Sequence, residues 1–298
     1  MSEQATPLTA QQLEPIDPGL AVGGVRLAVS DLERSVDFYE RVLGLRVIAR
    51  EGASARLGAD SERATLTLEG LSAAAPVRVG STGLFHVAWL HPSRADLANT
   101  VHRIAHSRWQ IDGAADHGVS EAIYLSDPDG LGIEIYADRP EAQWETLPDG
   151  SVRMVTIALD LDDLLAQSAR ELVPAIAPGT RVGHVHLKVS DVRRSIAFYR
   201  DALGFSLRAQ MPSAAFLAAD GYHHHIGANS WQSAGAPPAP ANTPGLRLVE
   251  FDLSGEHALA ALERSLERAG EGPAYEREPR RMSLADPDGH PLAFLASE

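Results

Sequence analysis

The chain contains no cysteine. Disulfides, thiolate nucleophiles, cysteine-ligated zinc and iron–sulfur clusters are therefore excluded. Positive charge is also scarce, because 26 Lys and Arg residues stand against 40 Asp and Glu residues, which gives a formal net charge of −14. An acidic surface of this kind repels phosphate backbones and anionic lipids, so neither nucleic acid nor a membrane surface is an expected partner.

Long apolar runs are missing as well. The N-terminal stretch 1–20 is polar and holds neither an apolar signal core nor a membrane-spanning run. Hydrophobic residues make up 44% and charged residues 22% of the 298 residues, an ordinary balance for a globular protein that argues against disorder. We expect a soluble cytoplasmic protein, long enough for two domains or a repeat array.

Two segments of the chain repeat each other. Residues 25–47 and 185–207 match at 11 of 23 positions, at an offset of 160 residues. Both copies predict a strand of alternating apolar residues, a Ser-Asp helix N-cap and an amphipathic helix that ends at Leu-Gly. The Phe-Tyr pair in each copy is assigned to the helix core and to no chemistry.

A second pair of segments repeats a hairpin. Residues 124–137 and 283–296 each contain a strand, an Asp-Pro-Asp-Gly turn and a returning strand. Each hairpin is preceded by a strand and a helix: strands at 83–90 and 245–253, and helices at about 93–106 and 255–269. The chain is therefore predicted to consist of four modules, at about 21–80, 82–138, 181–232 and 244–297.

Strands that lead into helices and then into short strands predict an α+β protein with strongly curved sheets. We expect two domains, 21–138 with modules one and two and 181–297 with modules three and four. The connector 139–180 between them is predicted to contain a strand at 154–159 and a helix at 161–173. The Ala-Pro-rich segment 234–244 is predicted to be a loop.

The modules act as controls for one another when functional residues are sought. Side chains of the types that bind metals occur in modules two and three. The matching positions in modules four and one hold residues of other types. The matching pairs are His86 against Leu248, Glu134 against Ala293, His184 against Gly24 and His186 against Arg26. Chance would not confine these side chains to two of the four modules. We therefore infer one site that modules two and three share.

Two histidines and one carboxylate on three strands form the donor set that holds non-haem Fe(II) with three positions open for catalysis. His86, His184 and Glu134 fit this set. Taken alone, a strand histidine is more often a hydrogen-bonded core residue, and a glutamate after a hairpin is usually a surface charge. Their coordinated absence from the sister modules favours a metal site over a metal-free structural protein.

The remaining histidines carry weaker signals. His186 shares a strand face with His184 and is expected to line the same cavity. In the run 223–225, alternation places the middle residue on the face opposite to its neighbours unless a bulge intervenes, and a solvated polar strand is the alternative. Histidines near helices and turns are expected at the surface: His91, His102, His106, His257 and His290.

At these residues the sequence resembles the vicinal oxygen chelate superfamily, and within it the type I extradiol ring-cleaving dioxygenases, especially the bacterial catechol 2,3-dioxygenases. The resemblance covers about 20–297, and its most specific segments are VGHVHLKVSD, GYHHHIGANSW and DHGVSEAIYLSDPDGLGIEIYADRP. It implies paired βαβββ modules that curl around a metal cavity, with metal ligands at His86, Glu134 and His184. Many extradiol enzymes take their ligands from the third and fourth modules. Here modules two and three would have to pair instead.

The resemblance also implies helper residues. Tyr124 stands ten residues before Glu134, which is the spacing of the family's tyrosine. The family's acid–base histidine matches His224. A further substrate-side histidine is suggested by His117, although its spacing to the tyrosine departs from the family's usual pattern.

These assignments imply an extradiol dioxygenase that uses Fe(II) to insert O2 into a catecholic aromatic molecule. Mn(II) suits the same ligands. The expected cavity walls are His186, Trp89, Trp231 and the loop 234–244, which favour an aromatic-sized, partly apolar substrate. The family commonly forms homo-oligomers, so one is expected here.

Two other functions remain open at this stage. One is a glyoxalase-like metal-dependent isomerase or an epoxide-opening transferase, neither of which needs a redox change, so oxygen consumption separates them from a dioxygenase. The other is a non-catalytic small-molecule binding protein of the same fold, such as a drug-sequestering resistance protein. The presence of a complete ligand set counts against this second alternative.

Overall fold

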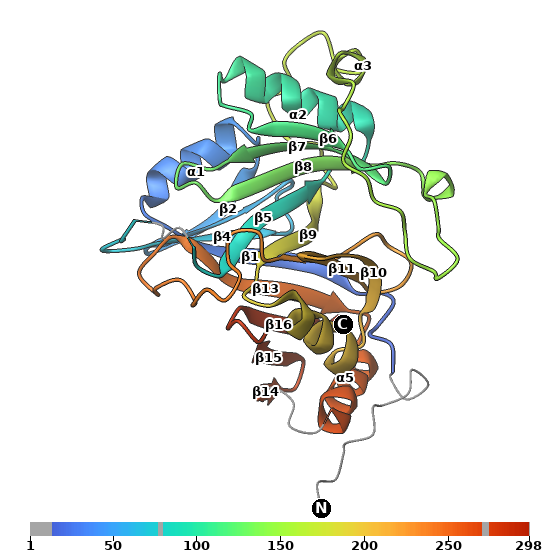
Figure 1. Ribbon diagram of the computed structural model, residues 1–298. Coiled ribbons are helices and arrows are strands. Elements are labelled where there is room, and N and C mark those ends of the chain that lie inside the picture. The colour runs from blue at the N-terminus through green and yellow to red at the C-terminus, as the bar shows by residue number, and fades with distance from the viewer. Residues whose placement is uncertain (1–13, 77–79, 270–273, 298) are drawn as a thin grey trace, which may run out of the picture.

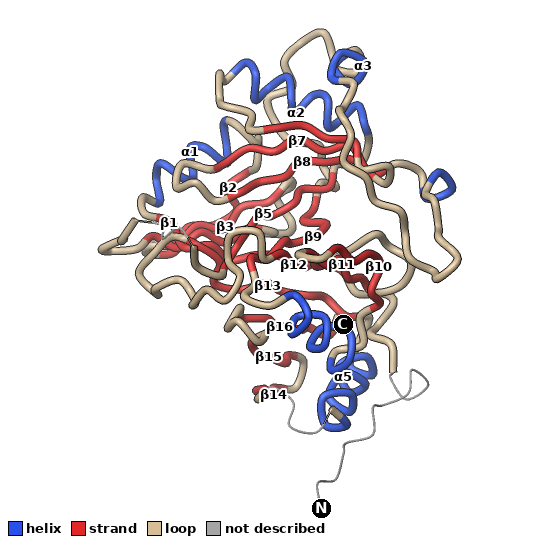
Figure 2. The backbone as a smooth tube through the Cα atoms, viewed as in Figure 1, coloured by secondary structure: helices blue, strands red, loops and turns tan. Residues whose placement is uncertain are grey.

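The computed structural model describes residues 14–76, 80–269 and 274–297, so the polar N-terminal stretch lies outside the described residues up to residue 13. Within these ranges, no helix is long and apolar enough to cross a membrane. Each predicted module is present as a strand, a helical segment and three further strands. The tube in Figure 2 shows how the strands gather into two sheets with helices on the outside.

The first two modules lie before the connector. Module one contains β1 (Ala21–Val29), α1 (Leu32–Arg41), β2 (Arg46–Glu51), β3 (Ser54–Gly58) and β4 (Leu66–Gly70). Module two contains β5 (Gly83–Leu90), α2 (Arg94–His106), β6 (Gly113–Asp116), β7 (Ser120–Ser126) and β8 (Gly132–Asp138).

The last two modules follow the connector. Module three contains β9 (Arg181–Lys188), α4 (Val192–Ile196), the π-helical turn η3 (Ala197–Ala202), β10 (Ser206–Met211), β11 (Ala214–Ala218) and β12 (Ile226–Asn229). Module four contains β13 (Gly245–Leu253), α5 (Glu256–Arg268), β14 (Tyr275–Glu278), β15 (Arg281–Ala285) and β16 (Pro291–Ala296).

The described strands form two eight-stranded sheets that each join two modules (Figure 1). One sheet has the order β14-β15-β16-β13-β1-β4-β3-β2 and joins modules four and one. The other has the order β10-β11-β12-β9-β5-β8-β7-β6 and joins modules three and two. The predicted α+β fold of βαβββ modules is confirmed, and so is the expected pairing of module two with module three.

The two halves of the sequence are therefore not two separate sheets. Each sheet takes one module from 21–138 and one from 181–297, because β1 pairs antiparallel with β13 and β5 pairs antiparallel with β9. The two domains predicted at 21–138 and 181–297 are divisions of the sequence, and each sheet draws one module from each of them.

Repeated polar residues tie the two sheets together, and this explains why the sequence repeats them. The hydroxyl and main-chain N–H of Ser30 donate to Asp129 in the hairpin of module two, and Arg34 pairs with the same carboxylate. The hydroxyl of Tyr39, which is buried as predicted, donates to Asp127 at 3.3 Å. The matching contacts in modules three and four join Ser190 and Arg194 to Asp288, and Tyr199 to Asp286.

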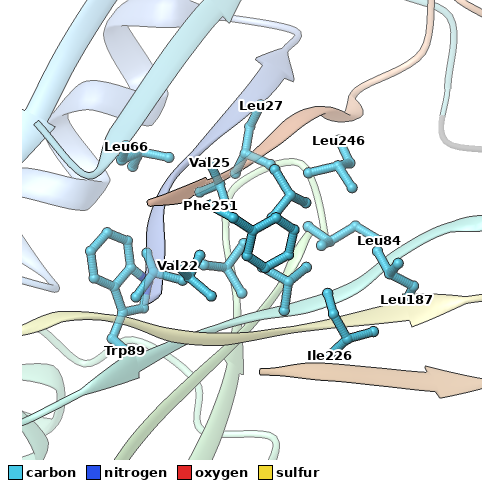
Figure 3. Close-up of a cluster of buried hydrophobic side chains, with 14 of the residues drawn as sticks. Val22, Val25, Leu27, Leu66, Leu84, Trp89, Leu187, Ile226, Leu246 and Phe251 are labelled. Carbon is cyan, nitrogen blue, oxygen red and sulfur yellow. The ribbon is translucent and has the colours of Figure 1, made fainter. Parts of the chain in front are cut away.

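The main core lies between the two sheets, where apolar side chains of β1 and β13 meet those of β5 and β9 (Figure 3). Trp89 belongs to this core and is fully buried. Successive strand residues point to opposite faces, so Trp89 faces away from the side that carries His86. Its assignment to the cavity wall is therefore wrong, because that assignment ignored the alternation.

The connector is less regular than predicted. The segment 154–159 forms no strand and pairs only through a bridge between Ile157 and Asp116 at the end of β6. The helix predicted at 161–173 is limited to α3 (Leu161–Leu165), which Asp160 caps, and a short 3-10 helix, η2 (Glu141–Gln143), precedes it. The predicted loop 234–244 contains neither helix nor strand and is confirmed.

Two histidines that were expected at the surface are buried. His290 contacts Asp286, and His91 lies under α2, where its Nδ1 donates to the carbonyl of Trp89 at 3.2 Å. The Nε2 of His91 accepts from the hydroxyl of Thr100 at 3.0 Å. Burial lowers the pKa of His91 to about 4. A position beside a turn or a helix did not predict exposure correctly, because the segments that carry His91 and His290 fold against the core.

The buried His91 predicts a pH dependence of stability. Its folded-state pKa lies below its unfolded value, so the unfolded chain takes up a proton first and stability falls as pH drops from about 6.5 to 4. Relative to pH 7.5, this contribution amounts to about 2 kcal/mol at pH 5. In H91Q, urea unfolding at the two pH values should show a correspondingly smaller acid loss. H106Q, at an exposed histidine, is the control, and equal acid losses in wild type and H91Q would contradict the prediction.

Candidate metal centre and catalytic cavity

Strand register brings the predicted ligands to one face of the sheet. Ala88 of β5 pairs with Glu134 of β8 on one side and with His184 of β9 on the other, so the three residues form one row. His86 precedes Ala88 by two residues and occupies the same face in the next row. Neighbouring strands lie about 4.8 Å apart. The small side chain of Ala88 leaves space in which the longer side chains converge.

The three ligand atoms lie close enough to share one ion. Nε2 of His86 is 3.0 Å and Nε2 of His184 is 3.4 Å from Oε2 of Glu134. All three ligand atoms lie within 4.8 Å of one another. Bonds of about 2.1 Å to one metal place two ligand atoms about 3.0 Å apart at a right angle and about 3.4 Å apart at a tetrahedral angle. The observed separations match these values.

Hydrogen bonding does not account for this geometry. Nε2 of His86 and Nε2 of His184 are buried and have no hydrogen-bond partner among the described residues, although both lie near the carboxylate of Glu134. Buried polar atoms without partners are costly and rare. A divalent cation would satisfy both nitrogens and the carboxylate at once, so the residues present fit a bound metal.

The electrostatics also suit a metal. Burial by itself would raise the pKa of Glu134, but the imidazoles of His184 and His86 hold that pKa well below its usual value. Burial lowers the pKa of His184 to about 4. The donor set is therefore an anionic carboxylate with a neutral His184, and metal binding requires these protonation states.

The other sheet shows what the fold does without a site. Where module three has His186, module one has Arg26, which pairs with Glu69 at 3.1 Å. On the same sheet Glu250 lies 3.4 Å from Arg281. The positions that match the three ligands hold Gly24, Leu248 and Ala293, which are buried and carry no ligand atom.

A cavity of about 310 Å³ opens over the three ligands. Its polar lining includes Tyr124, His117, His186 and His224, all of which the sequence placed at the site. Trp231 also lines it and is 52% exposed, so it stands at the mouth. Two expected contributors are absent from the described lining: Trp89, which is in the core, and the loop 234–244, which borders a different cavity.

A chain of hydrogen bonds sets the tautomer of His224. Asp138 can only accept, so Nε2 of His223, 3.0 Å away, carries a proton. In the tautomer of His223 that carries its single proton on Nε2, Nδ1 accepts from Nδ1 of His224 across 2.7 Å. This leaves Nε2 of His224 as a lone pair. Burial holds the pKa of His224 well below its usual value, so its ring is a neutral base.

A second chain holds Tyr124. Nδ1 of His117 donates to the main-chain carbonyl of Val155 at 2.7 Å, so Nε2 accepts from the hydroxyl of Tyr124 at 2.6 Å. Burial and then the charge of Glu134 raise the pKa of Tyr124, which keeps it a neutral phenol. The sequence placed both side chains at the site but gave no sign of their contact, because the connector supplies the carbonyl.

Several residues of the site escaped the sequence analysis. Asp138, four residues after Glu134 on the same strand face, was detectable from alternation, and it fixes His223. Other residues reach the cavity from β5, the connector, β10 and β11, and no local sequence pattern predicts their position there. They are Phe85, Met154, Val155, Thr156, Met211 and Phe216.

Comparisons with known proteins agree with this geometry. A family model described as the Glyoxalase/Bleomycin resistance protein/Dioxygenase superfamily matches residues 21–135 and 181–294. The catechol-2,3-dioxygenase of Bacillus subtilis (strain 168) is 40% identical over 252 residues, which cover 84% of this chain and 88% of that relative. The metapyrocatechase of Geobacillus stearothermophilus is 29% identical over 205 residues, which cover 66% of this chain and 55% of that relative.

The same fold occurs in solved structures. Glyoxalase I of Zea mays aligns with a TM-score of 0.59 and 18% identity over 93% of this chain and 92% of that chain. At this low identity the likeness concerns the fold.

The metal centre leads to a direct prediction. Purified protein, dialysed against Fe(II) or Mn(II) without oxygen, should retain about one metal ion per chain by elemental analysis. E134Q and H86A should weaken retention by about 100-fold or more, because each removes a direct ligand. E250Q, which changes a glutamate on the other sheet, should retain the metal. Full metal content in both ligand variants would refute the assignment.

Proposed function

The chain belongs to the glyoxalase/bleomycin resistance protein/dioxygenase superfamily, and we propose that it is an extradiol dioxygenase that opens the ring of a catechol with O2. The observation that carries this proposal is the buried convergence of His86, Glu134 and His184 beneath a mostly apolar cavity. The chain's 40% identity to a catechol-2,3-dioxygenase supports the same reaction. The predicted resemblance to the vicinal oxygen chelate dioxygenases is confirmed at the level of the family.

We propose Fe(II) as the resident metal, although Mn(II) suits the same donors. Two imidazoles and one carboxylate leave several coordination positions open. The chemistry that a bound Fe(II) supplies is chelation of both catechol oxygens and activation of O2. The strand-borne ligands His86, Glu134 and His184 hold that position rigidly.

The role of His224 follows from its tautomer. The proton on Nδ1 is held by His223, so the free lone pair of Nε2 belongs to the ring that lines the cavity. His224 is thus suited to accept a proton from a catechol hydroxyl and to return it later in the reaction. Asp138 and His223 act through His224 by holding its ring and tautomer in place.

Tyr124 provides a neutral hydroxyl on the opposite wall. It lies on β7 directly beside Glu134, and His117 holds its hydroxyl. From this position it can orient a substrate oxygen, and its raised pKa means that it does so without ionising. His186 lies among aromatic rings, with Phe85 at 5.1 Å and Trp231 at 5.7 Å between ring centroids, and contributes to the wall that faces the substrate ring.

The test of the reaction is oxygen uptake by Fe(II)-loaded protein with catechol, together with absorbance of the yellow ring-opened semialdehyde. H224A should keep its metal and lose about 10²–10⁴-fold in kcat, because a placed proton acceptor contributes that much. D138N should show a smaller loss of kcat, and the kcat of H106A should equal that of the wild type.

Other outcomes point to the rival functions. Metal binding without oxygen uptake for any catechol would favour an isomerase. Failure to bind any divalent metal would indicate a small-molecule binding protein. An H224A variant with full metal and unchanged kcat would remove His224 from the mechanism.

The cavity walls define a substrate class. Among the described residues, no arginine or lysine lines the cavity, and its walls include Phe85, Val119, Met154, Met211 and Phe216. A carboxylate on the substrate would be buried without a cation and close to anionic Glu134, which is costly. The volume of about 310 Å³ lies at the lower end of the range for small-molecule sites. We therefore propose small uncharged catechols, bare or alkyl-substituted, as substrates.

This proposal predicts discrimination by charge. The kcat/KM for 4-methylcatechol should exceed that for 3,4-dihydroxyphenylacetate by about 100-fold or more. Met211 is 40% exposed at the cavity edge, so M211R should recover part of the activity on the carboxylated substrate. Equal kcat/KM for both substrates in the wild type would contradict it.

The setting of the enzyme is also part of the proposal. A chain without cysteine needs no oxidising compartment, which is compatible with a cytoplasmic location. The homo-oligomer expected from the resemblance stays a prediction that sedimentation velocity can test.

A further inference from the structure

A second cavity, of about 110 Å³, lies at the end of β9, where Lys188 is part of its lining. Its described lining comes from the segment 81–84, from the loop 234–244 and from residues of modules two, three and four, and it shares no residue with the catalytic cavity. Its charged or titratable lining residues are Lys188 at the end of β9, Arg247 on β13, and Asp288 and His290 in the last hairpin.

Lys188 is the only lysine in the sequence, and it is partly buried in this cavity. No ion pair or hydrogen bond of its ammonium group occurs within the described residues. Burial lowers its pKa. A half-buried ammonium without a counter-ion is unfavourable, and an anion in the cavity would relieve this.

Arg247 presents a second cation that no carboxylate neutralises by direct contact. Its guanidinium donates to the main-chain carbonyls of Ala241 and Thr243, at 2.8 and 2.6 Å, and to that of Leu246 at 3.2 Å. These neutral partners position the group but do not balance its charge. Its pKa is lowered by burial, and Glu69 offsets that effect only in part.

The remaining polar groups leave the cavity positive. Asp288 is already engaged by Arg194 at 2.8 Å and by the N–H of Ser190 at 3.0 Å. His290 is buried, and its Nδ1 contacts Asp286 at 2.8 Å. Its Nε2 has no hydrogen-bond partner among the described residues. The cavity therefore offers two cations and one unused imidazole nitrogen in a protein whose net charge is −14.

The internal repeat shows that the fold itself does not require these residues. The positions that match Lys188, Arg247 and His290 in the sister modules hold Ala28, Phe85 and Leu131. Apolar residues are thus acceptable at all three places. The polar residues of modules three and four need another explanation, and a ligand provides one.

We propose that this second cavity binds a small oxyanion, a phosphate or a short carboxylate, between Lys188, Arg247 and His290. An ammonium and a guanidinium are the groups that proteins use for such anions, through charge-assisted hydrogen bonds. A volume of about 110 Å³ admits an anion of this size and excludes a larger molecule. The proposal does not depend on ring cleavage, so either can fail alone.

The test uses the single lysine as a reporter. In full-length protein labelled with [13C]lysine, the ε-carbon signal belongs to Lys188 alone. Titration with phosphate, and separately with succinate, at constant ionic strength should shift this signal saturably. The same titrations followed by calorimetry should give one site per chain.

Matched variants locate the site. K188M and R247M should weaken the binding of the anion by about tenfold or more, whereas K188R should still bind it. R56M removes one exposed positive charge elsewhere and should bind as wild type does. Circular dichroism checks that each variant is folded, and the lysine signal in R247M provides a second measurement should K188M not fold.

The outcomes separate the two anion sources. Saturation by phosphate but not by succinate assigns a phosphate site, and the reverse assigns a carboxylate site. A linear, non-saturating shift with both anions would overturn the proposal. Equal affinity of wild type, K188M and R247M would overturn it as well.

Discussion

The antiparallel pairing of β5 with β9 is the constraint on which the active site depends. It sets Ala88 opposite His184, while the parallel pairing of β5 with β8 sets Ala88 beside Glu134. A slip of one residue in either pairing would turn a ligand to the other face of the sheet, because strand side chains alternate. The apolar residues of the opposite face, Trp89 among them, hold the register by packing between the two sheets. The core therefore positions the metal ligands, although it touches none of the chemistry.

The internal repeat serves two purposes that are separable in the structure. One set of repeated residues, represented by Tyr39 with Asp127 and by Tyr199 with Asp286, joins the sheets in the same way at two places. These residues are alike in both halves because both halves need the same contact. The positions of His86, Glu134 and His184 differ from their counterparts because, among the described residues, the candidate metal site lies on one sheet. On the other sheet, pairs such as that of Arg26 with Glu69 occupy the corresponding face at partial exposure, where an ion pair contributes little but costs little.

The hydrogen-bond chains at the candidate site join residues that no sequence motif joins. Asp138 follows the ligand Glu134 on β8, and the histidine run lies before β12, yet they meet and set the tautomer of His224. The connector likewise contributes the carbonyl of Val155, which sets the tautomer of His117. The strand predicted at that place was wrong, because the segment uses a main-chain carbonyl to hold His117 and bridges the sheet at one residue only. Irregular backbone is suited to this purpose, since its carbonyls are not committed to a ladder.

The sequence by itself predicted the modules, the pairing of module two with module three, and the three residues, His86, Glu134 and His184, whose side chains converge in the structure. It could do so because strand periodicity and turn residues are local, and because the sister modules show which side chains the fold does not need. Only the tertiary structure decided the register across β5, the burial of His91 and Trp89, the bond between His117 and Tyr124, and the second cavity around Lys188. Each of these depends on which residues, distant in the sequence, come into contact across strands and between sheets. The local pattern of a single sequence does not contain that information.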